Sequence, residues 1–183
     1  MDNKKVALAA TIRPLTENDT DLIYTFFTSF SAQTRQFFTP HAIDLPGLTR
    51  IIHNIPSDPT AARFCATLIE DGQEVMAGYV FFWDWHTQVP WFGIGATDRF
   101  HGMGLGNQMM EFSIDYAKKH GKGGILLTTQ KPNVKAQAMY KKFGYEMLGQ
   151  DTHLDEYLMI LRFKNLTQMD TDKGTQIKED KNG

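Results

Sequence analysis

Cysteine is almost absent from this sequence of 183 residues, since Cys65 is the only one. An intrachain disulfide is therefore excluded, and the chain also lacks cysteines and histidines at the spacing of zinc ligands. We expect no bound metal, a buried and unreactive Cys65, and a reducing, cytoplasmic setting.

Long hydrophobic runs and an excess of positive charge are also missing. The longest apolar run, Met76 to Trp83, is far shorter than the roughly 20 residues that a membrane-spanning helix requires. The 19 Lys and Arg residues are balanced by 21 Asp and Glu residues, whereas nucleic-acid-binding domains usually carry a basic excess. The sequence therefore predicts neither a membrane nor a nucleic acid as partner.

The chain does contain enough hydrophobic residues, 42% of the total, to build the core of one ordinary domain. Runs of β-branched and aromatic residues predict strands at about 6–13, 62–70, 74–85, 89–96, 123–129 and 155–163. Apolar residues at helical spacing predict helices at 19–30, 45–55, 106–120 and 134–143.

These elements predict an α/β fold with a mixed sheet. The Asp71-Gly72 turn makes the two strands around it antiparallel neighbours, and the helix at 106–120 is long enough to connect two parallel strands. We expect a single domain over residues 1–163, with helices flanking the sheet. Residues 164–183 contain no aromatic residue, and we expect a disordered polar tail there.

The strongest local signal is the sequence H-G-M-G-L-G of residues 101–106, between a predicted strand and a predicted helix. Its glycines let the backbone come close to a ligand, and the free N–H groups at the start of a helix attract phosphate oxygens. The segment predicts a pyrophosphate-binding loop; the alternative is a turn that only packs the helix on the sheet. Asn107 stands where a dinucleotide fingerprint needs glycine, and the nucleoside-triphosphate loop is absent.

A second signal follows the strand predicted at 123–129. Asn133 and Tyr140 are seven residues apart, so both lie on one side of a helix that begins near Asn133. There they offer an amide and a phenol to the same ligand. The alternative assigns Asn133 to capping the helix and Tyr140 to packing.

Together the two signals resemble the pattern of a known family. From Trp91 to Tyr145 the chain has a strand, a glycine loop with its helix, another strand, and then N-x-x-A-x-x-x-Y-x-x-x-G-Y. This order is similar to that of the GCN5-related N-acetyltransferases (GNAT), and the similarity extends more weakly over residues 11–163. The resemblance implies a GNAT-like domain with a splayed sheet, acetyl-CoA as the acyl donor, and transfer of its acetyl group to a primary amine.

The resemblance also assigns residues to the donor. It implies that the pantetheine arm pairs with the strand before the loop and bonds Asn133, and that the loop holds the pyrophosphate. The implied cofactor-binding residues are Ile94, Gly95, Ala96, His101, Gly102, Met103, Gly104, Leu105, Gly106, Asn107 and Asn133. The family usually has Gln or Arg in place of His101, whose charge change at about pH 6 to 7 would make donor affinity depend on pH.

The implied reaction is direct attack of the amine on the thioester. Tyr140 would stand beside the sulfur, where a phenol of pKa about 10 can protonate or hydrogen-bond the departing thiolate. Backbone N–H groups of the splayed strand would polarise the thioester carbonyl. Some family members place a basic glutamate where this chain has Thr128, which leaves Asp84, His86 or a water chain as candidates for the base.

The acceptor side is expected to be aromatic. Phe37, Phe38, Trp83, Trp85 and Trp91 supply a wall that favours a small amine with an apolar or cationic body. Whether the acceptor is a small molecule or an amine of a peptide or protein stays open. An acyl-CoA-binding sensor without turnover is the second hypothesis, and an interaction domain whose glycine loop binds nothing is the third. A homodimer is compatible with each.

Overall fold

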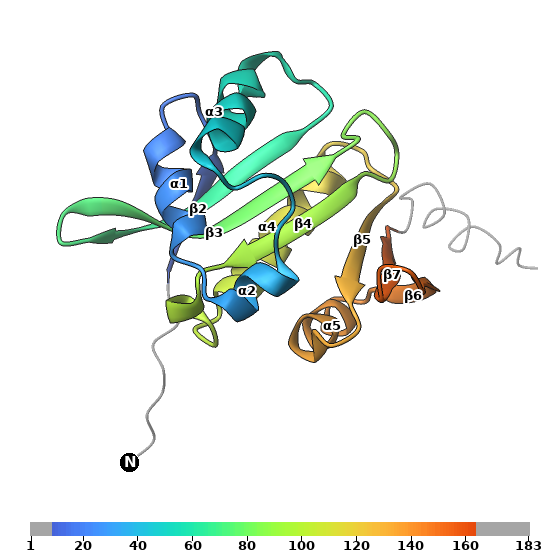
Figure 1. The fold of residues 1–183 in the computed structure, drawn as a ribbon. Coiled ribbons are helices and arrows are strands. Elements are labelled where there is room, and N and C mark those ends of the chain that lie inside the picture. Colours follow the sequence, from blue (N-terminus) through green and yellow to red (C-terminus); the bar gives the residue numbers. More distant parts are fainter. Residues whose placement is uncertain (1–8, 164–183) are drawn as a thin grey trace, which may run out of the picture.

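The computed structural model describes residues 9–163, so the tail expected at 164–183 lies outside the described residues. Figure 1 shows the arrangement of the elements. In chain order they are β1 (Thr11–Pro14), α1 (Thr20–Thr28), α2 (Ala32–Phe37), α3 (Leu45–Asn54), η1 (Ile55–Ser57), β2 (Ala62–Glu70), β3 (Gln73–Trp83), β4 (Trp91–Ala96), η2 (Asp98–Phe100), α4 (Leu105–Lys119), β5 (Gly124–Gln130), α5 (Val134–Lys142), β6 (Glu146–Asp151) and β7 (Glu156–Arg162). None of the helices within the described range is long and apolar enough to cross a bilayer.

The strands form one sheet in the order β1-β2-β3-β4-β5-β7-β6. β4 and β5 are parallel, and every other neighbouring pair is antiparallel. The hairpin turn at Asp71-Gly72 and the crossover through α4 are both present where the sequence predicted them. The expected α/β fold with a mixed sheet and flanking helices is therefore confirmed.

Some predicted boundaries differ from the structure. The strand expected at 6–13 is described only from Thr11, and the helix expected at 19–30 ends at Thr28. A new helix, α2, begins directly afterwards because the Ser31 side chain accepts a hydrogen bond from the Thr34 N–H. The prediction missed β6, whose residues are mostly exposed and which pairs with β7 at the sheet edge, so that it has no buried face to give an apolar pattern.

Two hydrophobic cores lie on opposite faces of the sheet. α1 and α3 cover one face, and α4 and α5 cover the other (Figure 1). Alternate residues of β3 enter different cores, with Tyr79 and Phe81 packed against α1 while Val80 and Phe82 face α4. The continuous apolar run from Met76 to Trp83 is explained by this burial on both faces.

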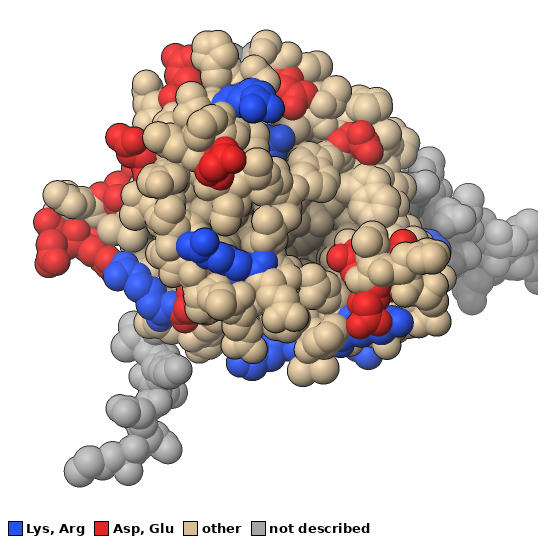
Figure 2. Space-filling view, viewed as in Figure 1, with Lys and Arg blue, Asp and Glu red and all other residues tan. Residues whose placement is uncertain are grey.

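The sheet opens between β4 and β5. Their only register pair is Trp91 with Leu126, supported by a hydrogen bond of 3.0 Å from the Leu126 N–H to the Pro90 carbonyl. Beyond that point the strands separate (Figure 1), and the molecular surface is hollowed between them (Figure 2). The splay that the family resemblance implied is therefore present.

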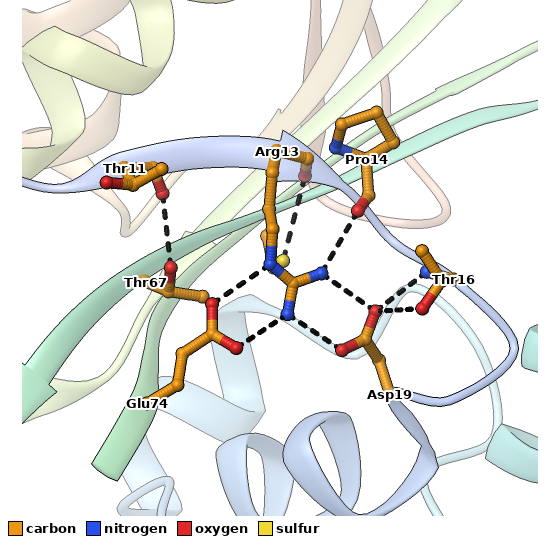
Figure 3. Close-up of polar contacts among 8 residues, drawn as sticks. Thr11, Arg13, Pro14, Thr16, Asp19, Thr67 and Glu74 are labelled. Carbon is orange, nitrogen blue, oxygen red and sulfur yellow. Dashed lines mark hydrogen bonds and ion pairs between the residues drawn. The ribbon is translucent and has the colours of Figure 1, made fainter. Parts of the chain in front are cut away.

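An ion-pair network fastens the N-terminal strand to its neighbours (Figure 3). Arg13 of β1 donates to both carboxylate oxygens of Asp19, at 2.8 and 2.9 Å, and to both of Glu74, at 2.9 Å each. The Asp19 carboxylate also accepts bonds from the N–H and hydroxyl of Thr16. The Arg13 hydrogen bonds lower the pKa of Asp19 against the opposing effect of burial, and they lower the pKa of Glu74 in the same way.

Replacing Asp19 should therefore destabilise the protein in a pH-dependent manner. We expect Asp19→Asn to lower the free energy of unfolding by about 2 kcal/mol at pH 7. A carboxyl group whose pKa is lowered by folding stabilises the protein fully at pH values above its pKa in the unfolded chain, which is about 4. This contribution disappears as the pH falls through its pKa in the folded protein. Urea unfolding at pH 7 and at pH 3 should thus show the difference from wild type shrinking in acid.

Asp21→Asn, an exposed position in the first turn of α1, is the matched control and should cost no more than about 0.5 kcal/mol. An equal loss for Asp19→Asn at both pH values would contradict the role given to the network.

Candidate active site

The hollow between β4 and β5 is a cavity of about 870 Å³. Residues of β4, the end of β5, the glycine loop and the start of α5 line it, and α2 with the segment after it covers one side. A smaller hollow of about 390 Å³, between α4, α5 and β7, contains none of the predicted site residues. The larger cavity is therefore the candidate site.

The glycine loop has the backbone geometry of an anion-binding turn. Gly102 and Gly104 have φ values of +75° and +85°, which side-chain-bearing residues rarely adopt. The N–H groups of Gly102, Gly104, Leu105 and Gly106 donate to no described residue. These groups lie at or beside the N-terminus of α4, a helix of 15 residues whose dipole adds positive potential there.

The side chains around the loop have different surroundings. Gly102, Gly106 and His101 line the cavity, whereas Met103, Gly104, Leu105 and Asn107 do not. The side chains of Leu105 and Met103 pack into the core. The side chain of Asn107 accepts a hydrogen bond of 3.3 Å from Lys142 and thereby joins α4 to α5.

His101 has a structural contact as well as a place in the cavity wall. Its Nε2 lies 3.0 Å from the carbonyl oxygen of Ala96, to which the ring donates. The ring thus links the glycine loop to the end of β4. The predicted pH dependence of donor binding through His101 stays a prediction.

The β4 residues Ile94, Gly95 and Ala96 all line the cavity, as the resemblance implied. β4 pairs with β3 along its full length but with β5 only at Trp91, so its other edge has no partner strand among the described residues. Gly95 also has a packing role, because a Cβ there would collide with the Phe38 ring that lies over the strand. An extended ligand can therefore pair with the free edge of β4.

Asn133 and Tyr140 both line the cavity from α5. The Asn133 side chain accepts a hydrogen bond of 3.3 Å from the Ala136 N–H and so caps the helix. Its side-chain NH₂ group has no described partner and remains free to donate. For Asn133 the capping alternative is thus correct without excluding a place in the site.

Tyr140 is 7% exposed and packs against Tyr145, with ring centroids 5.6 Å apart. Burial raises the pKa of the Tyr140 phenol, and the same effect raises that of Tyr145. The phenol of Tyr140 therefore keeps its proton throughout the range in which proteins work. Of the two rings, only Tyr140 reaches the cavity; the Tyr145 hydroxyl is buried without a hydrogen-bond partner in the described chain.

Polar contacts that the sequence analysis missed hold α2 over the cavity. The Asp98 carboxylate accepts bonds from the Ser31 N–H and hydroxyl, at 2.9 and 2.8 Å, and from the Thr34 hydroxyl. Burial opposes ionisation of Asp98, but these bonds outweigh it and lower its pKa to about 2. At the other end of α2, the Gln130 amide donates to the Gln36 carbonyl at 2.8 Å.

Four of the five aromatic residues expected near the acceptor line the cavity: Phe37, Phe38, Trp83 and Trp91. Trp85 does not line it. Its ring stacks on Tyr116, and the Lys122 ammonium lies 4.4 Å from the ring centroid. Phe81 also lines the cavity and was not predicted. It was missed because it reads as an ordinary core residue within the apolar run of β3.

The structure does not bring the candidate bases to this cavity. Asp84 and His86 are exposed, and Asp84 begins a turn by accepting bonds from the N–H and hydroxyl of Thr87. Thr128 lines the cavity but carries no titratable group. The remaining sequence-based candidate is a water chain.

Cys65 takes no part in the site. It is fully buried, as expected, and burial raises the pKa of its thiol to about 12, so it is a poor nucleophile. No group of three His, Cys, Asp or Glu side chains able to hold a metal occurs within residues 9–163.

The family model for the acetyltransferase (GNAT) family matches residues 24–145, which include the glycine loop and the Asn133–Tyr140 pair. The chain belongs to the GNAT acetyltransferase family. This confirms the resemblance seen in the sequence.

Solved acetyltransferase structures share the fold at low sequence identity. Ribosomal-protein-S5-alanine acetyltransferase from Vibrio fischeri has a TM-score of 0.70 at 12% identity, over 85% of this chain and 97% of that one. Spermidine N-acetyltransferase from Vibrio cholerae, solved with CoA and spermine, has 0.68 at 19%, over 84% and 95%. PaiA N-acetyltransferase from Thermoplasma acidophilum, solved with coenzyme A, has 0.66 at 13%, over 85% and 100%.

A matched pair of glycine substitutions tests the GNAT loop. Gly104 and Gly72 have φ values of +85° and +79°, and a Cβ on either would meet no atom within 4 Å. Each Gly→Ala change should therefore cost a similar stability, about 1 kcal/mol, from backbone strain alone. Only Gly104→Ala shifts the N–H groups of the loop, and we expect it to weaken acetyl-CoA binding about tenfold in calorimetric titration. Equal affinity in both variants would remove the loop from the donor site.

Proposed function

We propose that this protein is an acetyl-CoA-dependent N-acetyltransferase that transfers the acetyl group directly to a primary amine. The observation that carries the proposal is the shared cavity. The unbonded N–H groups of the glycine loop, the free edge of β4 and the Tyr140 phenol all meet there. These three features match, respectively, the pyrophosphate, the extended amide-bearing arm and the thioester sulfur of acetyl-CoA.

The residues fit the donor by their chemistry. Gly102, Gly104 and Gly106 present N–H groups to phosphate oxygens, and no side chain at these positions blocks a close approach. The free NH₂ group of Asn133 can donate to an amide carbonyl of the pantetheine arm. When bound, acetyl-CoA supplies the activated acetyl group as a thioester.

The amine nitrogen forms the new C–N bond, the C–S bond breaks, and the nitrogen gives up a proton to water. N–H groups on the free edge of β4 polarise the thioester carbonyl as negative charge develops on its oxygen. Tyr140 acts on the sulfur of the thioester. Because burial raises its pKa well above that of a thiol, about 8.5, full proton transfer is uphill, and a hydrogen bond to the developing thiolate is the favoured contribution.

Tyr140→Phe should separate turnover from binding. Loss of a hydrogen bond to a developing charge should lower kcat about 100-fold, while the affinity for acetyl-CoA changes by less than about twofold. The measurements are thiol release with an amine panel and calorimetric titration with acetyl-CoA.

Tyr145→Phe is the matched control, because its hydroxyl is buried without a described partner and lies outside the cavity lining. It should leave kcat unchanged. Unchanged kcat in Tyr140→Phe would deny the phenol a chemical role, and binding of acetyl-CoA with no turnover of any amine would favour the sensor hypothesis.

A further inference from the structure

One carboxylate in the cavity is not used by the reaction described above. Glu156, the first residue of β7, is half-buried and lines the cavity. No described residue donates a hydrogen bond to its carboxylate or forms an ion pair with it. Other acidic residues of the same hairpin are paired, Asp155 with Lys131 at 3.0 Å and Glu146 with Arg162 at 2.8 Å.

Strand register places Glu156 on the aromatic face of the sheet. Residues that pair directly across strands project to the same face, and so do alternate residues along a strand. Glu156 pairs with Gln130, which shares its face with Leu126. Leu126 pairs with Trp91, and Trp91 pairs with Trp83. The carboxylate therefore lies on the same face as the two tryptophans, but beside the end of β5 that bonds α2 through the Gln36 carbonyl, and not at the Leu126 end where Trp91 pairs.

The other charged groups of the cavity do not neutralise Glu156. Asp98 carries a charge of the same sign and is itself occupied by the hydrogen bonds that hold α2. The basic side chains of the lining are His101 on the glycine loop and Lys135 in the first turn of α5, both on elements assigned to the donor. Figure 2 shows acidic side chains at the rim of the hollow, beside the region of β5 and β7.

This environment has a defined chemical preference. Aromatic faces attract cations through their quadrupole, and an unpaired, partly desolvated carboxylate gains most from a cationic partner. A ligand carboxylate would meet a like charge in a medium of reduced dielectric constant. The part of the cavity around Glu156 thus favours a positive group and opposes a negative one.

We infer that Glu156 binds the ammonium group of the acceptor and restricts the enzyme to cationic amines that carry no neighbouring carboxylate. The inference rests on the proposed function, and it names the class of acceptor. α-Amino acids are excluded by charge, whereas amines of the same body without the carboxylate are accepted. Glu156 acts here in recognition, before the amine loses its proton to water and attacks.

The test compares phenethylamine with phenylalanine, which differ only in the carboxylate. Wild type should prefer phenethylamine in kcat/KM, and Glu156→Gln should lower kcat/KM for phenethylamine about 10- to 100-fold with little effect on phenylalanine. Glu156→Lys should reverse the preference. Glu146→Gln, which removes a paired carboxylate outside the cavity, should leave both values unchanged.

Two binding measurements separate this inference from the proposed function. Acetyl-CoA affinity should be equal in wild type and both Glu156 variants, and a wild type that does not bind acetyl-CoA would overturn the proposed function. Saturation-transfer NMR with phenethylamine needs no turnover and should detect binding to wild type that is lost in Glu156→Gln. Equal binding to both, or binding to neither, would overturn the assignment of Glu156, as would an unchanged substrate preference.

Discussion

The site depends on two parallel strands that meet at one end and separate at the other. If β4 and β5 paired along their length, their main-chain hydrogen bonds would close the sheet and leave no cavity. The meeting end is secured at Trp91 and Leu126, and Lys122 holds the preceding loop through the Thr87 carbonyl at 3.0 Å and the Trp85 ring. At the other end, His101 bonds the glycine loop to the end of β4. Gln130 at the end of β5 bonds both α2, through the Gln36 carbonyl, and α5, through the Gln137 side chain.

Several side chains combine support of the fold with a place in the cavity wall. Asn133 caps α5 and still has an amide to offer, and His101 ties its loop to Ala96. Gln130 joins the end of β5 to α2 across the opening. Because these contacts join the walls of the cavity within the chain itself, the cavity is largely preformed, which lowers the entropic cost of binding.

The local motifs could be predicted from sequence, and the contacts between distant segments could not. The glycine loop lies within the β4–α4 unit and the Asn133–Tyr140 pair within the β5–α5 unit, so the geometry of each follows from the local order of residues. Asp98 anchors α2 across 67 positions of sequence at Ser31, and no periodicity indicates that pairing. Glu156 was missed because both faces of β7 carry apolar residues, so its sequence pattern does not show which face opens into the cavity. β6 was missed for lack of a buried face.

The charge distribution of the cavity follows from the same topology. Parallel strands place a helix N-terminus at the carboxyl end of β4, so positive potential collects where the chain turns into α4. The antiparallel return of β7 beside β5 places the start of β7 near that same end of the sheet, and in this chain the residue there is Glu156. The proposed phosphate and ammonium sites therefore lie across the opening of the sheet from each other, one on the β4 side and the other on the β7 side. Tyr140, which burial keeps neutral, lines the same cavity. In the proposed reaction a neutral donor there would stabilise the departing thiolate without repelling an incoming ammonium.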